Sequence, residues 1–462
     1  MDKTIKCTIK EYSKRGFGIG YYTHPVSCEQ IPVEIAHTLV GDEIEAAVYK
    51  KRKRYRKGKL LNIIQPSKSR IEPKCSHVGM CGGCAWQEMK YNDQLTQKQN
   101  TINKIFKKYE CEKRNIVECD LPFNYRNKME FSFSENRANT KFLGLMIAHA
   151  STYVFNVTEC HLASFWVSNV VNAIRDWWEK TNLKAYNLSD NSGHLRTLTL
   201  RESFTDQKKM VMLTVSGNPE FALSKDLIDS FKKAVKEVLL EDDPAIFLQI
   251  HQSIKGRPTQ LFEMHLNGDA YIQEKLTIKG YELFFKISPT SFFQPNSRQA
   301  EKIYSLALDT ASVSDDDIVY DLYSGTGTLS MIFAKHAKKV ISIELNAHAV
   351  CDAKENIRLN NIFNIEVIQG DVGKILSEKK DLPKPDLVVV DPPRAGLDTA
   401  AMQNIERLLP KKILYISCNP YSQIENINEI CSFGYKLKIL QPVDQFPHTY
   451  HIENIAYLTL ES

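Results

Sequence analysis

Residues 320–330 of the chain read YDLYSGTGTLS, an apolar run that passes through two glycines into a second apolar run. Gly325 and Gly327 allow the backbone to turn tightly and to approach a ligand, and the amide groups that open the following helix face that ligand. Position 330 is a serine, so the three-glycine fingerprint of dinucleotide-binding proteins is incomplete. The stretch predicts a strand, a glycine turn and a helix that form one side of a cofactor site.

The segments on either side of this turn alternate between helix and strand patterns. Helical patterns cover 297–312, 328–337 and 347–361, and strand patterns cover 316–325, 339–346 and 385–394. Such alternation is typical of a parallel, doubly wound sheet. We therefore predict a Rossmann-like α/β domain over residues 286–462.

Acidic residues end the strands next to the glycine turn. Glu344 closes the following strand, 23 residues beyond Asp321, and Asp371 ends the third strand. A carboxylate at the position of Glu344 can accept hydrogen bonds from both ribose hydroxyl groups of a nucleoside. A carboxylate at the position of Asp371 can accept a hydrogen bond from the adenine amino group. The turn lacks the basic residues that the phosphates of NAD or ATP require. The pattern favours S-adenosylmethionine, a nucleoside cofactor with little negative charge.

Two further residues are predicted at the same edge of the sheet. Asp391 ends the fourth strand, in DPPR, and Cys418 ends the fifth, in YISCNP. Doubly wound folds bind ligands at this edge. A free cysteine is most often a small buried core residue, and the alternative here is a nucleophile beside the cofactor. Asp-Pro-Pro followed by an aromatic residue is typical of amino-group methyltransferases that act on bases, and Arg394 in that position counts against this chemistry.

A thiol in this place suits methyl transfer to C5 of a pyrimidine. That carbon becomes a nucleophile only after a thiolate has added to C6, and the C5 proton must then be removed by a general base. Glu453, at the start of the last apolar strand, is a candidate for that base. His448-x-x-His451-x-Glu453 can also be considered as a metal cluster, but its spacing suits no familiar site.

A cysteine knuckle lies nearer the N-terminus. Cys75, Cys81 and Cys84 have the spacing C-x5-C-x2-C, with Gly82 and Gly83 between the last two. Closely spaced thiolates bind metals, and the glycines leave backbone amide groups free to face sulfur. From the residues alone, zinc and an iron–sulfur cluster are nearly equal choices. The candidates for a fourth ligand are Cys111, Cys119, Cys160 and His77.

The head of the chain is basic. Residues 1–74 hold 16 Lys and Arg against 8 Asp and Glu, and eight of the ten residues in 50–59 are basic. Short strand patterns with glycine kinks over 1–65 predict a small closed barrel of the OB type. A basic cluster on such a barrel favours phosphate-backbone binding over a merely solvated hairpin tip.

The middle of the chain, 66–285, is predicted to be an α+β domain. Its first helix, over 91–110, is amphipathic and is a candidate to pack on the catalytic domain. With 462 residues, two or three domains are expected. Eleven cysteines without an export signal predict a reducing cytoplasm. No apolar run approaches the length of a membrane span, so we expect no membrane partner.

DLYSGTGTLS, VVVDPPRAGL, YISCNP and FPHTYHIE together resemble the RNA uridine-C5 methyltransferase family, which makes 5-methyluridine from S-adenosylmethionine. The basic head is similar to the family's TRAM domain and the knuckle to its cluster-binding domain. The resemblance implies that Cys418 is the nucleophile, that Glu453 is the base, and that Asp391 lies between cofactor and uracil. The further cofactor contacts it implies are Gln294, Tyr323, Thr328, Glu344 and Asp371, with Thr328 in a position where several relatives carry Asn.

The same resemblance implies a [4Fe-4S] cluster held by Cys75, Cys81, Cys84 and Cys160. Because methyl transfer needs no electrons, the cluster is expected to have a structural or RNA-shaping role. Family members with the cluster cysteines mostly resemble 23S rRNA enzymes, while close relatives modify the tRNA T-loop. We therefore predict 23S rRNA as the substrate, with tRNA as the alternative.

A uridine inside a helix hides its C6 atom, so the target must be flipped out or lie in a loop. Residues 124–128 and the pair Phe292–Phe293 are candidates for stacking and phosphate contacts. The alternative from another class is a catalytically silent RNA-binding protein that keeps the fold. Nothing in the sequence demands more than a monomer.

Overall fold

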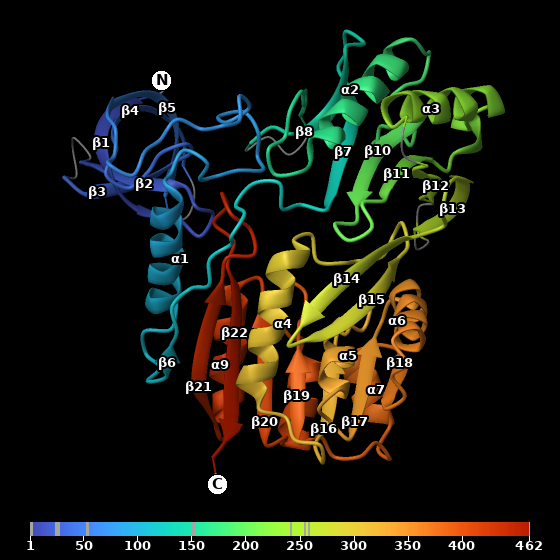
Figure 1. Cartoon of the computed structure of the whole chain (residues 1–462). Coiled ribbons are helices and arrows are strands. Elements are labelled where there is room, and N and C mark those ends of the chain that lie inside the picture. Colours follow the sequence, from blue (N-terminus) through green and yellow to red (C-terminus); the bar gives the residue numbers. More distant parts are fainter. Residues whose placement is uncertain are drawn as a thin grey trace.

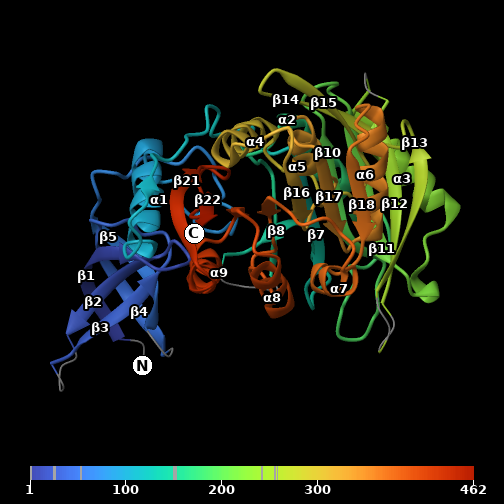
Figure 2. The same ribbon diagram turned by 90° about the horizontal axis from the view of Figure 1, so that it is seen from below.

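The computed structural model describes residues 3–23, 28–51, 55–148, 153–240, 243–253, 256 and 259–461. Three bodies are built on sheets: an N-terminal barrel (residues 3–65), a central sheet (residues 128–267) and a third sheet, here called the catalytic sheet, formed by residues 112–113 and 318–460. The barrel and the central sheet lie beyond the carboxyl ends of the parallel strands of the catalytic sheet (Figure 1). In the view from below, the barrel lies at the left, apart from the central sheet, which overlaps the parallel strands of the catalytic sheet on the right (Figure 2). In the described part of the chain, no helix is long and apolar enough to cross a membrane.

The N-terminal strands close into a barrel in the order β1-β2-β3-β5-β4, which fits the predicted OB-like fold. The strands are β1 (Lys3–Tyr12), β2 (Gly18–Thr23), β3 (Gln30–Ile35), β4 (Glu43–Lys51) and β5 (Arg56–Gln65). Alternation of apolar and polar residues buries Ile5, Ile9, Val33 and Ile44 inside. Of the basic cluster at 50–59, residues 52–54 lie outside the described residues.

Helix α1 (Tyr91–Ile105) follows the cysteine knuckle and is shorter than the predicted 91–110. Ile102 and Phe106, four residues apart, are fully buried in the core of the catalytic sheet. Phe106 caps the helix, with φ −98° and ψ 23°, and its amide donates to the Ile102 carbonyl. Through these two side chains, α1 packs on the core of the catalytic sheet.

The central sheet has the order β13-β12-β11-β10-β7-β8-β9. Its strands are β7 (Lys128–Glu135), β8 (Lys141–Met146), β9 (Val154–Asn156), β10 (Leu195–Glu202), β11 (Lys209–Ser216), β12 (Ala245–Gln252) and β13 (Gln260–Asn267). Helices α2 (Phe165–Glu179) and α3 (Lys225–Val238) pack together and cover one face (Figure 1). A short 3-10 turn, Pro219–Phe221, precedes α3.

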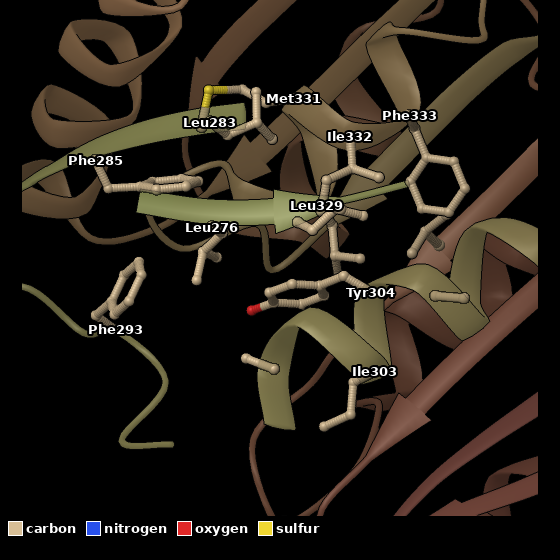
Figure 3. Packing of buried hydrophobic residues seen from close by; sticks show 14 of the residues in the cluster. Leu276, Leu283, Phe285, Phe293, Ile303, Tyr304, Leu329, Met331, Ile332 and Phe333 are labelled. Atoms are coloured by element: carbon tan, nitrogen blue, oxygen red, sulfur yellow. The ribbon is translucent and has the colours of Figure 1, made fainter. Parts of the chain in front are cut away.

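A hairpin, β14 (Ile272–Ile278) and β15 (Tyr281–Ile287), joins this sheet to the catalytic part. It packs on α4 (Ser297–Ala311) and α5 (Thr328–Ala334), with Phe285 and Phe293 in ring contact at 5.4 Å between centroids. Figure 3 shows Tyr304 of α4 within this cluster, with its hydroxyl oxygen on the side of the Phe293 loop. The hairpin therefore fixes the segment that carries residues 288–296.

The catalytic sheet has the order β18-β17-β16-β19-β20-β22-β21-β6. Its strands are β16 (Ile318–Leu322), β17 (Lys339–Glu344), β18 (Ile365–Gln369), β19 (Leu387–Val390), β20 (Lys412–Ser417), β21 (Tyr435–Val443), β22 (Glu453–Leu460) and β6 (Glu112–Lys113). The helices are α4, α5, α6 (Ala347–Leu359), α7 (Val372–Glu378), α8 (Thr399–Leu408) and α9 (Pro420–Ser432).

The sheet is mixed rather than fully parallel, which corrects the prediction. Strands β16 to β20 are parallel, but β22 runs antiparallel to both β20 and β21. Only residues 444–452 join β21 to β22, and a parallel return needs a crossover of a dozen residues or more. The antiparallel return places the start of β22 beside the end of β20.

Candidate active site

The glycine turn after β16 has the backbone geometry that its composition predicts. Tyr323, Gly325 and Gly327 all have positive φ angles, of 65°, 55° and 79°. Glycine adopts this region without strain, whereas tyrosine there is an uncommon conformation. Gly327 also abuts Ala353, because a Cβ at position 327 would lie 3.2 Å from the Ala353 Cβ. Thr328 is buried as the first residue of α5.

Glu344 closes this turn from the neighbouring strand. Its carboxylate accepts hydrogen bonds from the Gly325 amide at 2.9 Å and the Asn346 amide at 2.7 Å. Asp371 begins α7, where its carboxylate accepts from the Lys374 amide at 3.0 Å. Leu345, directly after Glu344, is a large apolar residue that is 65% exposed.

Asp321 does not face the turn. It is fully buried on β16, and its carboxylate accepts a hydrogen bond from the Ser330 hydroxyl at 2.5 Å. Burial raises the pKa of this carboxyl group to about 7. Asp321 therefore supports the turn from inside the sheet, whereas Glu344 and Asp371 lie at its edge.

The end of β20 and the start of β22 meet at the carboxyl edge. Ser417 pairs with Asn454 in the antiparallel register, so Cys418 and Glu453 occupy the next opposed positions. Asp391 directly follows β19, the other neighbour of β20. The structure thus brings together three of the predicted site residues, which are separated by up to 62 positions in the sequence.

The surroundings of Cys418, Glu453 and Asp391 favour the uncharged form of each group in the protein without RNA. Burial, and then the neighbouring Glu453 carboxylate, raise the pKa of the Cys418 thiol to about 11. Burial and the nearby Asp391 raise the pKa of Glu453 well above its ordinary value. Burial also raises the pKa of Asp391, to about 7. Glu453 itself is 4% exposed.

Arg394 opposes these shifts. Its guanidinium lowers the pKa of both the Cys418 thiol and the Glu453 carboxyl group, by charge and, for the thiol, by a hydrogen bond. The Arg394 carbonyl accepts from the Asn419 side chain at 2.8 Å and from the Ser422 hydroxyl at 3.0 Å, which ties the DPPR turn to the start of α9. The sequence analysis used Arg394 only to disfavour amino-group chemistry. Its place directly after two prolines is the signal that marks it as a site residue.

Gln294 approaches the same edge from the loop before α4. Its side-chain oxygen accepts a hydrogen bond from the Gln445 side chain at 3.3 Å, and its backbone carbonyl accepts one from the Asn127 side chain at 2.9 Å. The Tyr304 side chain forms a hydrogen bond with Gln294. Burial, and then the nearby charges of Asp391 and Glu453, raise the pKa of Tyr304. Two residues before Gln294, Phe292 is 64% exposed. Gln294 is therefore held in place, while Phe292 is available to a ligand.

The predicted cluster cysteines surround a cavity of about 390 Å³ in the central part of the molecule. All four of Cys75, Cys81, Cys84 and Cys160 line it. Burial, and to a smaller extent the neighbouring thiols, raise the pKa of Cys75, Cys81 and Cys84. The Gly83 amide donates to the Cys81 sulfur at 3.3 Å, and the Gln87 side chain donates to the Cys84 sulfur at 3.5 Å. The donor set and its amide hydrogen bonds fit a sulfur-ligated cluster.

The other candidates for a fourth ligand sort differently. Cys111 packs against the catalytic core, and the buried Cys119 donates to the Leu121 carbonyl at 3.3 Å. Neither lines the cavity. His77 does line it and forms a compact group with Cys75 and Glu159, all within 4.8 Å of one another. A mononuclear metal on that group remains a competing arrangement to a cluster on four thiolates.

A family model for tRNA (uracil-5-)-methyltransferases matches residues 90–461. The chain belongs to this family. As an RNA methyltransferase of this family, it uses S-adenosylmethionine as the methyl donor. The glycine turn and the Glu344 acceptor fit the nucleoside part of that donor.

Relatives support the family assignment over nearly the full length. An uncharacterized RNA methyltransferase of Protochlamydia amoebophila is 44% identical over 93% of this chain and 100% of its own. Another, of Clostridium tetani, is 32% identical over 99% of this chain and 97% of its own. The fold is similar to the crystal structure of Pyrococcus abyssi tRNA (uracil-54, C5)-methyltransferase in complex with S-adenosyl-L-homocysteine. That likeness has a TM-score of 0.72 and 22% identity, and covers 98% of this chain and 100% of the other.

Proposed function

We propose that this member of the tRNA (uracil-5-)-methyltransferase family methylates C5 of a specific uridine in RNA through a covalent bond between Cys418 and C6 of the base. The observation that carries the proposal is the register of β20 and β22, which sets a thiol opposite a carboxyl group at the ligand-binding edge. A pyrimidine C5 methyl transfer needs both groups on one base.

The Cys418 thiolate adds to C6, forming a carbon–sulfur bond and an enolate that makes C5 nucleophilic. S-adenosylmethionine supplies the methyl group to C5 and leaves as S-adenosylhomocysteine. Glu453, as its carboxylate, then removes the C5 proton, the C5–C6 double bond re-forms and the sulfur leaves C6 with its electron pair. Arg394, which favours the anionic forms of both groups, would stabilise the thiolate before addition and after elimination.

The cofactor contacts are proposed for the residues around the glycine turn. Glu344 would exchange its hydrogen bonds to the turn amides for ribose hydroxyl groups, and Asp371 would accept the adenine amino proton. Asp391 would lie between the cofactor and the uracil ring. The remaining proposed cofactor contacts are Gln294, Tyr323, Gly325, Gly327 and Thr328.

We further propose a [4Fe-4S] cluster on Cys75, Cys81, Cys84 and Cys160. Bound there, it would join the knuckle, which carries the first three cysteines, to Cys160, which lies just before α2 of the central domain. Cys81 already forms a β-bridge with Ile147, the residue that follows β8. The cavity also contacts Phe292, Phe293 and Pro295, so the cluster would support the loop that carries Gln294. Its proposed role is structural.

The proposed substrate is 23S rRNA. The second candidate is the T-loop of tRNA, favoured by the names of the family model and of the Pyrococcus abyssi enzyme. The proposed division of the chain is an RNA-binding TRAM barrel over 1–65, a central cluster-binding domain over 66–285 and a methyltransferase domain over 286–462. We propose that the protein acts as a cytoplasmic monomer.

A covalent trap tests this function. The protein and S-adenosylmethionine are incubated with 23S rRNA fragments or tRNA transcribed with 5-fluorouridine, because fluorine at C5 cannot leave as a proton does. The expected result is an adduct stable in SDS on one class of RNA, absent in Cys418→Ala. Cofactor binding without an adduct on either RNA would instead favour amino-group methylation or a catalytically silent RNA-binding role.

A further inference from the structure

Two fully buried charges lie outside the proposed chemistry. Lys98 of α1 and Asp444, the first residue after β21, form an ion pair at 2.5 Å with neither side chain exposed. The Tyr91 hydroxyl donates to the other Asp444 oxygen at 2.8 Å. A buried ion pair is often no more stabilising than apolar residues of similar volume. We therefore consider a role for the Lys98–Asp444 ion pair other than stabilising the fold.

The ion pair stands at the start of the 444–452 loop, defined here as the residues that join β21 to β22. Lys98 also donates to the Phe446 carbonyl at 3.1 Å. Gln94, one helical turn earlier, accepts a hydrogen bond from the His448 amide at 2.8 Å. Residues four apart share a helix face, so one face of α1 holds both ends of the segment 444–448. Figure 1 places α1 alongside β21.

Residues outside α1 also form hydrogen bonds with the backbone of the 444–452 loop. Asn296 donates to the Gln445 carbonyl at 3.1 Å, and the Tyr125 hydroxyl donates to the Pro447 carbonyl at 3.2 Å. The Trp86 amide donates to the His448 carbonyl at 3.0 Å. Every residue from 445 to 448 thus has a backbone group bound from outside the loop. The chain then runs through the buried Ile452 directly into Glu453.

We propose that Lys98 and Gln94 are positioning residues for the general base Glu453, acting through the 444–452 loop. This inference rests on the proposed function. Glu453 acts after addition and methyl transfer, when it removes the C5 proton. A displaced Glu453 therefore slows elimination and leaves the earlier steps intact, so the methylated RNA stays attached to Cys418.

The test uses the full-length protein with S-adenosylmethionine and unmodified transcripts of 23S rRNA and of tRNA. In Lys98→Met, the first turnover, measured as formation of S-adenosylhomocysteine, is expected to proceed near the wild-type rate. Steady-state turnover is expected to fall by about 100-fold, the cost of a misplacement of about 1 Å. An SDS-stable adduct on natural uridine is expected to accumulate, and the same is expected of Glu453→Gln. Lys98→Arg, which keeps the charge and the donor, restores part of the turnover.

Two variants separate positioning from stability. Ile102→Ala removes a fully buried side chain one turn further along the same helix, without touching the loop, and is expected to lower stability without accumulating adduct. The double variant Lys98→Met/Asp444→Leu replaces the ion pair with apolar residues, is expected to fold, and still accumulates adduct because the Phe446 carbonyl loses its donor.

Equal losses in first and later turnovers, with no adduct above the wild-type level in either Lys98 variant, would overturn the inference. So would adduct in Ile102→Ala equal to that in Lys98→Met. Failure of the proposed function has a different signature, namely full turnover in Cys418→Ala, no adduct in Glu453→Gln, or no methylation of either transcript by the wild type.

Discussion

Cys418 and Glu453 are opposed across β20 and β22, one position beyond the Ser417–Asn454 pair. Each is buried enough to disfavour its own charge, and the Glu453 carboxylate further raises the pKa of the thiol. Both groups are therefore disposed to be neutral before RNA binds. Ionisation of the thiol depends on the positive charge of Arg394, which gives the first prediction.

Alkylation of Cys418 by iodoacetamide should be slow at pH 7 and rise about tenfold per pH unit up to pH 9, because only the thiolate reacts and its pKa is about 11. Arg394→Met removes the charge that lowers this pKa, so alkylation at a given pH should be several-fold slower. Peptide mass spectrometry follows the reaction, with the exposed Cys351 as an internal reference. Unchanged or faster alkylation in Arg394→Met would contradict the assignment.

Glu344→Gln should weaken S-adenosylmethionine binding by about 10- to 100-fold, because a hydrogen bond to a charged acceptor is worth about 1.5–3 kcal/mol. Isothermal titration calorimetry measures the change. Glu366→Gln on the neighbouring β18 removes an acid that pairs with Lys339 and is the matched control. Equal affinities in both variants would rule out the ribose contact.

Cys84→Ser should lose bound metal and lower the melting temperature. The wild type, purified without oxygen, should contain iron and inorganic sulfide in equal amounts. Cys111→Ser, outside the cavity, should keep them. Zinc without sulfide in the wild type would favour the group formed by Cys75, His77 and Glu159 over a cluster.

Asp321→Asn should raise stability at pH 8.5 more than at pH 5. The folded pKa of Asp321 is about 7, above its ordinary value of 3.8. The native state therefore retains a proton that the unfolded state releases, and stability from this group is present below about pH 4 and lost as the pH rises through 7. At about 1.4 kcal/mol per pKa unit, the expected difference is about 1–4 kcal/mol. Urea unfolding at both pH values checks it, and a pH-independent effect would contradict it.

The sequence predicted local features of the site well. The glycine turn, the strands that end in acids and the cysteine knuckle each arise from neighbouring residues, and the structure contains them. The sequence analysis also placed Glu453 at the start of a strand. It did not predict that this strand pairs antiparallel with β20, because strand direction is decided by the short 444–452 loop and not by apolar alternation.

The polar contacts that α1 makes with residues 444–448 could not be predicted from the sequence pattern either. Gln94 and Lys98 are ordinary solvated residues by type, and helical periodicity marked only the apolar residues around Ile102. Both are fully buried because their partners come from residues 444–448, about 350 positions later. Arg394 was not predicted as a site residue for a similar reason, because its partners Cys418 and Glu453 are distant in the sequence and lie at the ends of other strands.

The shortest strand of the catalytic sheet has a consequence for how the protein can be made and divided. β6 pairs in parallel with β21, joining residues 112–113 to 439–440. It covers part of a strand edge that would otherwise be open to pairing with another molecule. A fragment beginning at residue 286 would expose that edge and leave Asp444 without Lys98, which makes it prone to self-association. During synthesis, residues 112–113 wait for almost the entire chain to emerge before they can dock, so closure of this sheet is among the last events of folding.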